Sequence, residues 1–403
     1  MITRTLALSV AALAGALFAF PAAAQKHYGP GVTDTEITLG QTMPYSGPAS
    51  AYGTIGKAEA AYFDMINAQG GVNGRKIKLI SLDDGYSPPK TVEQTRRLVE
   101  QDNVLAVFGS LGTATNTAIQ KYLNERKVPQ VFLATGATKW GDPKRFPWTI
   151  GWQPPYQTEG HIYARYLLEH MPNARVAILY QNDDYGKDYV KGLTDGLGDK
   201  AKTMIVKEMS YEVSDPTDEP QVVALQSSGA DVFFNVSTPK FAAQAIRKAH
   251  AIGWMPVQLL NSVSTSIAAV LKPAGLEASK GLISVQYAKA PTDPAWRDDP
   301  GYKDWLAWMD KYYPSGDKAD GLNVGGYNAA QTMVQVLRQC GDDLSRENVM
   351  KQVANLHHLA LPMLLPGITV DTSPTDWYPV KQEQLARFDG TTWVRFGEVV
   401  ASK

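Results

Sequence analysis

The sequence predicts an α/β protein with two related lobes. Strand-like apolar runs alternate with helical patterns and are joined by short links, an order that predicts parallel sheets with right-handed crossovers. This alternation runs once up to about residue 149 and starts again near Gly151, over a segment of similar size. The chain of 403 residues is also long against the roughly 150 residues usual for one domain.

Residues 1–24 have the features of a secretory signal peptide. Arg4 precedes an apolar stretch from residue 6 to residue 20, and Pro21-Ala-Ala-Ala24 ends the segment. A basic start, a short apolar stretch and small residues at its end are typical of a cleavable export signal, whereas a membrane anchor would need roughly 20 apolar residues. We expect cleavage after Ala24 and a mature protein in the periplasm.

The first unit begins with a strand, a helix and a second strand. Residues 37–43 alternate in polarity as a strand does, and residues 56–67 carry apolar side chains at helical spacing. The glycine-rich stretch 69–74 ends that helix, since glycine accepts the positive φ of a turn. The other predicted elements of this unit are strands at 76–81, 104–108 and 128–133 and helices at 90–101 and 117–126.

The strand at 104–108 turns sharply into the next helix, and this turn is the first candidate site. Gly109 and Gly112 interrupt the apolar run, and the cluster Thr113-Ala-Thr-Asn-Thr117 follows. We interpret the cluster as N-cap residues before a helix that begins at Thr117. Backbone N–H groups and hydroxyls at a helix start suit a carboxylate, although an ordinary capped turn has the same sequence features.

Polar or glycine-containing loops follow the predicted strands of the first unit. In sheets of this kind, ligands gather at the carboxyl ends of the strands. The convergence of these loops therefore favours a binding site at the turn after residue 108. The loops are 44–47, 83–84, 110–113 and 134–138.

The second unit repeats the alternation, and a third segment departs from it. A polar loop, Asn182 to Gly186, follows the first strand of the second unit. Asp389-Gly390 between alternating runs predicts a hairpin near the end of the chain. Strands are predicted at 175–180, 201–208, 231–236 and 258–260, helices at 158–171, 187–197, 220–229, 240–252, 301–313, 323–340 and 346–356, and a strand-like run at 278–290.

Charge and cysteine content exclude several classes of partner. The formal net charge is −1, and acidic and basic residues are interleaved, so neither nucleic acid nor an anionic membrane is an expected partner. Cys340 is the single cysteine, which leaves no internal disulfide and is expected to be a small buried apolar residue. No metal-ligand spacing occurs, adjacent His357 and His358 included, and we expect no cofactor.

Several aromatic and acidic residues have a structural explanation at hand. Trp148, Trp152 and Tyr156 stand near the junction of the two units, where packing is a better explanation than a ligand contact. Trp305 and Trp308 are three apart on a predicted helix, which is typical of a buried face. We expect Asp83-Asp84 to hydrogen-bond a neighbouring loop.

Five motifs resemble one family in their order along the mature chain. They are Pro44-Tyr-Ser-Gly-Pro48, Ala51-Tyr-Gly53, Ile66-Asn-Ala-Gln-Gly-Gly-Val-Asn-Gly-Arg-Lys-Ile77, Asp83-Asp84 and Asp184-Tyr-Gly186. The chain resembles the branched-chain amino acid type of periplasmic solute-binding protein, the receptor of an ATP-driven (ABC) importer. The resemblance implies a type I periplasmic binding protein fold, with two Rossmann-like lobes joined by three crossovers and a ligand held between them. It places lobe one at 26–149 plus 281–365, and lobe two at 150–280 plus 366–403.

The resemblance also implies which residues touch the ligand. Its carboxylate would meet Thr113 and the loop after the next strand, and tyrosines from both lobes would contact it. Ser237 and Ser262 are further candidates in the second lobe. By this analogy the ligand-binding residues are Tyr52, Thr113, Ala134, Thr135, Gly136, Tyr185, Ser237 and Ser262.

Two departures from the family pattern concern the ligand's ammonium group. Ser237 stands where amino-acid-binding members commonly have Tyr, and Val263 stands where an acidic residue would meet the ammonium. An ammonium stripped of water with no compensating anion is unfavourable by several kcal/mol. The sequence leaves open whether the ligand is a hydrophobic amino acid or an aromatic or other hydrophobic acid.

A secreted enzyme such as a hydrolase on the same scaffold is the main alternative. The sequence contains no GxSxG, HExxH or GxxxxGK[ST] motif, so no recognised nucleophile, zinc or phosphate site supports it. A ligand-sensing regulator with the same lobes would need an N-terminal DNA-binding domain, whereas this chain begins with an export signal. We therefore expect a soluble, monomeric receptor, not itself membrane-spanning, that binds a small carboxylate and delivers it to the permease subunits of an ABC transporter.

Overall fold

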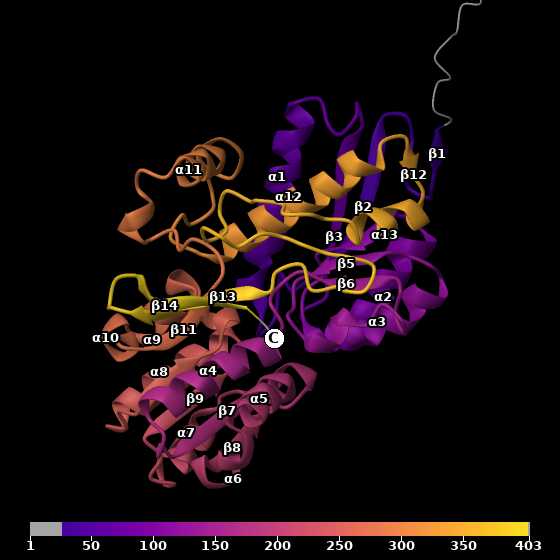
Figure 1. The fold of residues 1–403 in the computed structure, drawn as a ribbon. Coiled ribbons are helices and arrows are strands. Elements are labelled where there is room, and N and C mark those ends of the chain that lie inside the picture. The colour runs from indigo at the N-terminus through magenta and orange to yellow at the C-terminus, as the bar shows by residue number, and fades with distance from the viewer. Residues whose placement is uncertain (1–25, 402–403) are drawn as a thin grey trace, which may run out of the picture.

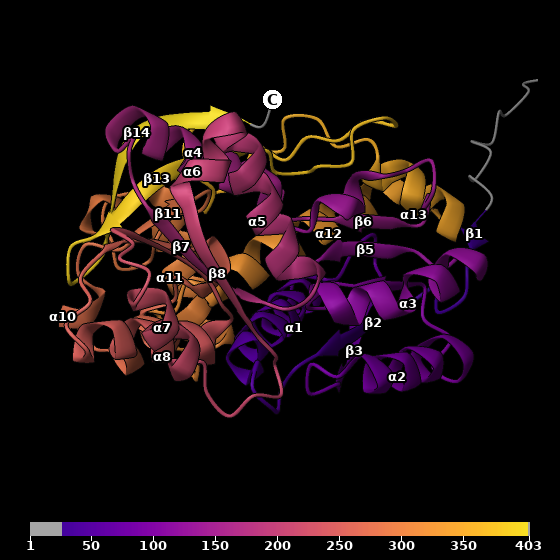
Figure 2. The same ribbon diagram turned by 90° about the horizontal axis from the view of Figure 1, so that it is seen from below.

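The computed structural model describes residues 26–401, so the predicted signal peptide lies outside the described residues. Figure 1 shows two lobes, each with a sheet covered by helices on both faces. Figure 2 shows the same lobes side by side from below. The prediction of a two-lobed α/β fold is confirmed. Within the described part of the chain, no helix combines the length and apolar character needed to cross a membrane.

The first lobe contains a five-stranded parallel sheet in the order β3-β2-β4-β5-β6. The apolar run predicted as a buried strand lies at its centre, and Val104 to Phe108 have no exposed surface. Helices α2 and α3 cover one face and α1 the other. The elements are β2 (Glu36–Met43), α1 (Gly53–Ala68), β3 (Lys76–Asp83), α2 (Pro88–Glu100), β4 (Ala106–Phe108), α3 (Thr113–Glu125), β5 (Gln130–Leu133) and β6 (Thr149–Gly151).

Helices from late in the chain complete the first lobe. Helix α12, orange in Figure 1, packs beside the indigo α1 across a core that includes Phe63, Tyr327 and Met333. Trp305 and Trp308 are buried in the same core, as their spacing predicts. The elements are α11 (Pro300–Tyr312), α12 (Leu322–Cys340), α13 (Arg346–Val353) and the two-stranded pair β1 (His27–Tyr28) and β12 (Asp343–Leu344).

The second lobe contains a seven-stranded sheet in the order β14-β13-β11-β10-β9-β7-β8. The predicted hairpin is confirmed as β13 and β14, which pair antiparallel at the edge beside β11. The elements are α4 (Tyr156–His170), β7 (Val176–Gln181), α5 (Asp184–Leu197), α6 (Ala201–Met204), β8 (Ile205–Tyr211), α7 (Glu219–Gln226), β9 (Val232–Val236), α8 (Pro239–Ala251), β10 (Val257–Leu260), α9 (Lys272–Ala274), α10 (Leu276–Ser279), β11 (Ile283–Gln286), β13 (Gln382–Phe388) and β14 (Trp393–Ala401).

Several helix boundaries differ from the sequence prediction. Helix α3 begins at Thr113 and not at Thr117, because Gly112 adopts a φ of 97° and turns the chain directly into the helix. Helix α5 begins at Asp184, because Asp183 caps it through the backbone N–H groups of Tyr185 and Gly186. The predicted loop to Gly186 is therefore the first turn of a helix. Likewise, 201–204 form α6 before strand β8 begins.

The chain passes between the lobes three times, after β6, after β11 and before β13. Strand β6 extends the first sheet to Gly151. Strand β11 (Ile283–Gln286) pairs with β10 in the second sheet, whereas the resemblance places 281–365 in lobe one. Each of these strands pairs with the sheet it leaves before the chain crosses. The lobe boundaries from the resemblance stay a prediction.

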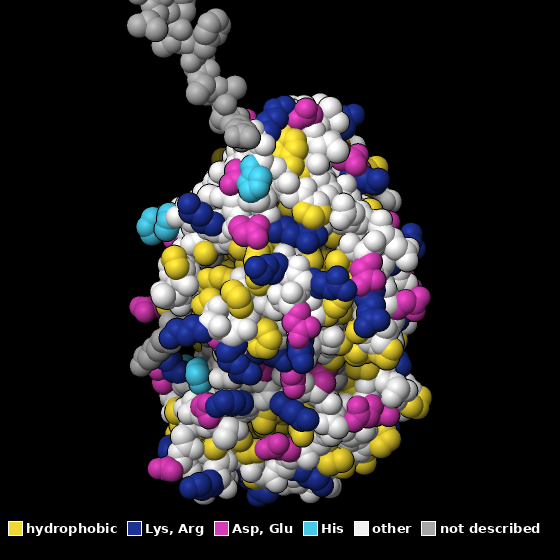
Figure 3. Space-filling model, turned by 90° about the vertical axis from the view of Figure 1, so that its right-hand side faces the viewer, with side chains coloured by type: hydrophobic (Ala, Val, Ile, Leu, Met, Phe, Trp, Pro, Cys, Tyr) yellow, Lys and Arg dark blue, Asp and Glu magenta, His cyan; other side chains and the backbone are white. Residues whose placement is uncertain are grey.

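The lobes also touch through side chains away from the crossovers. Lys139 of the first lobe forms an ion pair with Asp184 of α5 at 2.9 Å, and the Thr138 backbone N–H donates to Asp188 of the same helix at 2.7 Å. Figure 3 shows Lys and Arg side chains interspersed with Asp and Glu over one face of the molecule. This mixture agrees with the near-zero net charge.

Candidate functional site

A cleft lies between the lobes at the carboxyl ends of β4 and β5. It measures about 1100 Å³, its solvent-open mouth included, and both lobes and the crossovers line it. The lining residues that carry the argument below are Tyr52, Tyr86, Gly112, Thr113, Ala134, Tyr156, Tyr185, Thr238, Ser262, Val263, Tyr287 and Lys289.

The corner at Gly112 and Thr113 presents a helix start to this cleft. A Cβ at Gly112 would lie 2.5 Å from the Tyr86 ring, and φ is positive there, so glycine is required for the turn. No side chain caps the N-terminus of α3. The first-turn N–H groups of a helix lack intrahelical acceptors and attract negative charge. This corner therefore suits a carboxylate.

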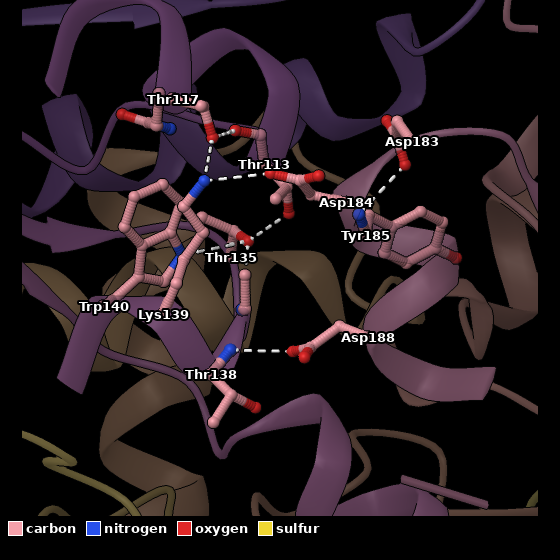
Figure 4. Close-up of polar contacts among 12 residues, drawn as sticks. Thr113, Thr117, Thr135, Thr138, Lys139, Trp140, Asp183, Asp184, Tyr185 and Asp188 are labelled. Atoms are coloured by element: carbon pink, nitrogen blue, oxygen red, sulfur yellow. Dashed lines mark hydrogen bonds and ion pairs between the residues drawn. The ribbon is translucent and has the colours of Figure 1, made fainter. Parts of the chain in front are cut away.

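The hydroxyl groups of Thr113 and Thr135 form a relay toward the same corner. Their oxygens are 2.7 Å apart, and both residues are 1% exposed. The Thr135 oxygen accepts from the Trp140 indole N–H at 3.4 Å and from the Ala137 backbone N–H at 3.3 Å. Either hydroxyl of this pair can be the donor, and when Thr135 donates, the Thr113 proton is left for an acceptor in the cleft. Figure 4 shows this arrangement.

Gly136 does not line the cleft, because a tyrosine occupies the space beside it. A Cβ at this position would lie 2.3 Å from the Pro154 carbonyl oxygen and 2.7 Å from Cε1 of Tyr156. Its own carbonyl oxygen accepts from the Tyr156 backbone N–H at 2.8 Å. A hydroxyl-bearing residue would not fit here without rearrangement, so Thr135 is the one hydroxyl that this loop places at the corner.

The predicted site residues fall into two groups. Tyr52, Thr113, Ala134, Tyr185 and Ser262 come together around the cleft, although the Ala134 backbone N–H already donates to the Ser110 carbonyl at 3.0 Å. Thr135, Gly136 and Ser237 lie behind the lining residues. Ser237 has no exposed surface and its hydroxyl has no partner, while the neighbouring Thr238 lines the cleft instead.

An aromatic cluster closes the side of the cleft formed by the second lobe. Tyr156 stacks on Tyr189 with ring centroids 4.4 Å apart and meets Tyr185 edge to face at 5.5 Å. The Tyr185 hydroxyl donates to Asn261 at 3.1 Å. Burial raises the pKa of Tyr185 well above its usual range, so its hydroxyl stays protonated. Rigid ring faces of this kind suit an apolar ligand body.

Ser262 is tied to a buried carboxylate. Its backbone N–H and its hydroxyl donate to the two oxygens of Glu159, each at 2.7 Å. The hydroxyls of Tyr163 and Tyr189 donate to the same two oxygens, also at 2.7 Å. Burial raises the Glu159 pKa to about 7. Four donors surround this carboxylate, so it holds the Ser262 loop in place and is not available to a ligand.

Lys289 is the one charged residue lining the cleft within 26–401. Its ammonium lies 2.6 Å from Asp299, and its side chain is 7% exposed. Val263, where the family pattern has an acidic residue, lines the cleft as an apolar side chain. The cleft therefore has a donor-rich corner and apolar walls, and no carboxylate group among its described lining residues.

Sequence reasoning missed several lining residues. Tyr156 was assigned to packing, but it lines the cleft as well as packing on Tyr189. Tyr86 follows Asp83-Asp84 at the carboxyl end of a strand, and this position could have marked it as a lining residue. Tyr287 and Lys289 lie on a crossover, where no local pattern marks them.

The acidic pair Asp83-Asp84 and the adjacent histidines, possible ligand or metal residues in the sequence, both lie outside the cleft lining. Asp83 accepts from the Tyr45 backbone N–H and from Ser46, and Asp84 accepts from the Tyr86 backbone N–H, so the pair holds neighbouring loops as predicted. His357 and His358 follow the end of α13. In the described part of the chain, no group of three or more His, Cys, Asp or Glu side chains is arranged to hold a metal.

Comparison with known proteins identifies the family. The family model described as "Periplasmic binding protein" matches residues 36–382. The Leu/Ile/Val-binding protein homolog 7 of Brucella abortus is 23% identical over 83% of this chain and 82% of its own.

Solved structures share the fold. A branched-chain amino acid ABC transporter protein from Thermus thermophilus with bound valine has a TM-score of 0.82 at 16% identity, over 92% of this chain and 98% of that one. A fatty acid ABC transporter substrate-binding protein from Thermomonospora curvata has a TM-score of 0.77 at 22% identity, over 94% and 95%.

Proposed function

The chain belongs to the periplasmic binding protein family, and on that premise we propose that it is the solute-binding receptor of an ABC importer. The family is a class of extracytoplasmic substrate-binding proteins of transport and not of enzymes, so the hydrolase alternative falls. The proposed ligand is a small hydrophobic carboxylate, held between the lobes and delivered unchanged to membrane permease subunits. We propose a periplasmic location and a monomeric state, as the sequence predicts.

The observation that carries this proposal is the corner at Thr113. Uncapped N–H groups of α3 and the Thr113 hydroxyl face a cleft whose other walls are aromatic and aliphatic. Each charge-assisted hydrogen bond contributes about 1.5 to 3 kcal/mol, and a micromolar dissociation constant needs about −8 kcal/mol in total. Two or three such bonds and one buried apolar group therefore suffice.

Binding would act on the arrangement of the lobes. The anion corner belongs to the first lobe, while Tyr185 and Ser262 belong to the second. A ligand that touches both lobes binds the closed arrangement better than an open one and shifts the population toward it. The permease would then distinguish the closed, loaded receptor from the open one.

The fold alone does not determine which ligand is bound. One structural neighbour holds valine, an amino acid, and another is described as a fatty acid transporter protein. The same scaffold therefore serves carboxylates with and without an ammonium group, and the choice depends on the residues of each cleft.

A thermal-shift screen followed by mass analysis tests the proposal. A ligand that binds only the native state raises its apparent stability. We expect a hydrophobic carboxylate to raise the melting temperature and to be recovered unchanged after long incubation. Turnover of the added compound, or no stabilisation by any carboxylate in a broad panel, would contradict a receptor of this kind.

A further inference from the structure

We propose that the carboxylate this receptor takes has no α-ammonium group. The inference rests on the proposed function and goes further by naming the ligand class that the cleft selects.

The lining residues of the cleft offer no counter-ion to the ammonium group of a zwitterion. The α-ammonium of an amino acid lies one carbon away from its carboxylate, so it would be placed close to the Thr113 corner. The lining residues described there contribute no carboxylate, and the charged side chain among them, Lys289, is already paired with Asp299 at 2.6 Å. An ammonium that leaves water for such a cleft would lose its hydration without gaining a counter-ion.

Glu159 and Asp183, two carboxylates behind the walls, are already engaged. Both oxygens of Glu159 accept two hydrogen bonds each. Asp183 caps α5 with one oxygen and accepts from the Gln181 amide with the other at 2.6 Å. Releasing either carboxylate toward a ligand would leave several buried donors without acceptors.

Asp320 is the acidic residue that the test must address directly. It is 6% exposed and lies between Ala319 and Gly321, which line the cleft. One of its oxygens accepts from the Ser266 hydroxyl at 2.8 Å and from the Leu322 backbone N–H at 3.0 Å. These bonds fix the carboxyl group at the start of α12. Burial raises the pKa of Asp320 above its usual range.

The walls around the corner match an uncharged body. Tyr52, Tyr86, Tyr156 and Tyr185 present ring surface, and Val263 presents an aliphatic one. Such surfaces gain free energy from covering an apolar chain or ring. A branched, linear or aromatic acid can place its carboxylate on α3 and its apolar part against these walls without an unpaired charge.

Titration calorimetry with matched ligand pairs tests the inference on the wild-type mature protein. The pairs are 4-methylpentanoate with L-leucine and 3-phenylpropanoate with L-phenylalanine, which differ only in the ammonium group. We expect the ammonium-free acid to bind at least about tenfold more tightly in any pair that binds. Equal or tighter binding of the amino acid overturns the inference but leaves the receptor proposal standing. If none of the four compounds binds, the inference falls for these ligands, and the receptor proposal is decided separately by the broad thermal-shift panel.

A charge introduced at Val263 gives an independent test. Val263→Glu supplies the missing anion, and Val263→Gln is its uncharged control of similar shape. We expect Val263→Glu to raise the affinity for L-leucine relative to 4-methylpentanoate by about tenfold or more, and the control to leave the ratio unchanged. An equal change in both variants contradicts the charge argument, and circular dichroism checks that each variant is folded.

Two further measurements test other ways in which the cleft could bind an ammonium group: removal of the Asp320 charge, and binding of glycine betaine, a quaternary ammonium compound. Asp320→Asn should leave the ratio of the two affinities unchanged, whereas a selective loss of L-leucine binding would identify Asp320 as the counter-ion and overturn the inference. Tyrosine faces can also attract a cation. Tighter binding of glycine betaine than of either ammonium-free acid would likewise overturn it.

Discussion

Thr113 owes its proposed role to the residues behind it. Trp140 and Ala137 donate to the Thr135 hydroxyl, which favours Thr135 as the donor to Thr113 and leaves the Thr113 proton for an acceptor in the cleft. This hydroxyl adds to the attraction that the first-turn N–H groups of α3 have for an anion.

We expect Thr113→Ala to weaken ligand binding by about 1 to 3 kcal/mol without unfolding the protein. The variant removes one hydroxyl donor and leaves the N–H groups of α3 in place. Titration calorimetry measures the effect, and Thr203→Ala, an exposed threonine in the second lobe, is the control. An unchanged affinity would remove Thr113 from the site.

Gly136 gives a second prediction at the residue scale. In Gly136→Thr the added side chain meets the Pro154 carbonyl and the Tyr156 ring, so we expect a loss of about 1 to 3 kcal/mol in the free energy of unfolding. Gly325→Ala, in helix α12 with open space around it, should instead be neutral or mildly stabilising. Urea unfolding of both variants measures the contrast, and equal stabilities would contradict the packing argument.

At the scale of elements, the sequence predicts the interiors of helices and strands better than their ends. Apolar periodicity locates α1, α12 and the buried β4, because burial of one face repeats along each element. The starts of α3 and α5 depend on the φ of Gly112 and on the Asp183 cap. Similar short sequences also form turns without starting a helix, so these local features do not fix a helix start by themselves.

The candidate site was predictable only in part, for a related reason. Tyr52 and Tyr185 stand in motifs that the resemblance marks, and Thr113 begins the cluster that follows Gly112. Tyr287 and Lys289 lie on a crossover, so they enter the cleft through the packing of the two lobes and not through a local pattern. The exclusion of Gly136 depends on the position of the Tyr156 ring, which no sequence motif specifies.

The start of helix α7 contains a buried carboxyl group that predicts a pH dependence. Asp218 has no exposed surface, neither of its oxygens has a hydrogen-bond partner, and burial raises its pKa to about 7. Because the folded-state pKa lies above the unfolded value, the protonated form is favoured by folding. The contribution of protonated Asp218 to the free energy of unfolding is complete below the unfolded-state pKa and is lost as the pH rises through about 7.

We therefore expect Asp218→Asn to reduce the loss of stability between about pH 5 and about pH 8. The amide cannot ionise, so the variant should gain stability relative to wild type at the higher pH. Glu159 has a raised pKa too, which leaves a residual slope in the variant. Urea unfolding at both pH values is the measurement, and identical slopes for the two proteins would contradict the assignment.

At the scale of the whole molecule, a partly exposed ion pair joins the lobes. Lys139 and Asp184 meet in Figure 4, with side chains 34% and 57% exposed. Pairs this accessible contribute about 0 to 1 kcal/mol and weaken with salt. We therefore expect this ion pair to contribute little to the free energy of closure.

We expect Lys139→Met to lower ligand affinity by no more than about fivefold, and the difference from wild type to shrink at high salt. The apolar stem is kept, so the change isolates the charge. Calorimetry at low and high salt measures it. A loss far beyond this range would mean that the ion pair, and not the ligand, holds the lobes together.

The most direct test of the account is a crystal structure with the tightest-binding acid from the matched pairs. We expect its carboxylate within about 2.7 to 3.2 Å of the Thr113 hydroxyl and a first-turn N–H group of α3. Its apolar part should lie against Tyr185 of the other lobe. An acid bound outside this cleft, or bound with its carboxylate away from Thr113, would contradict the account.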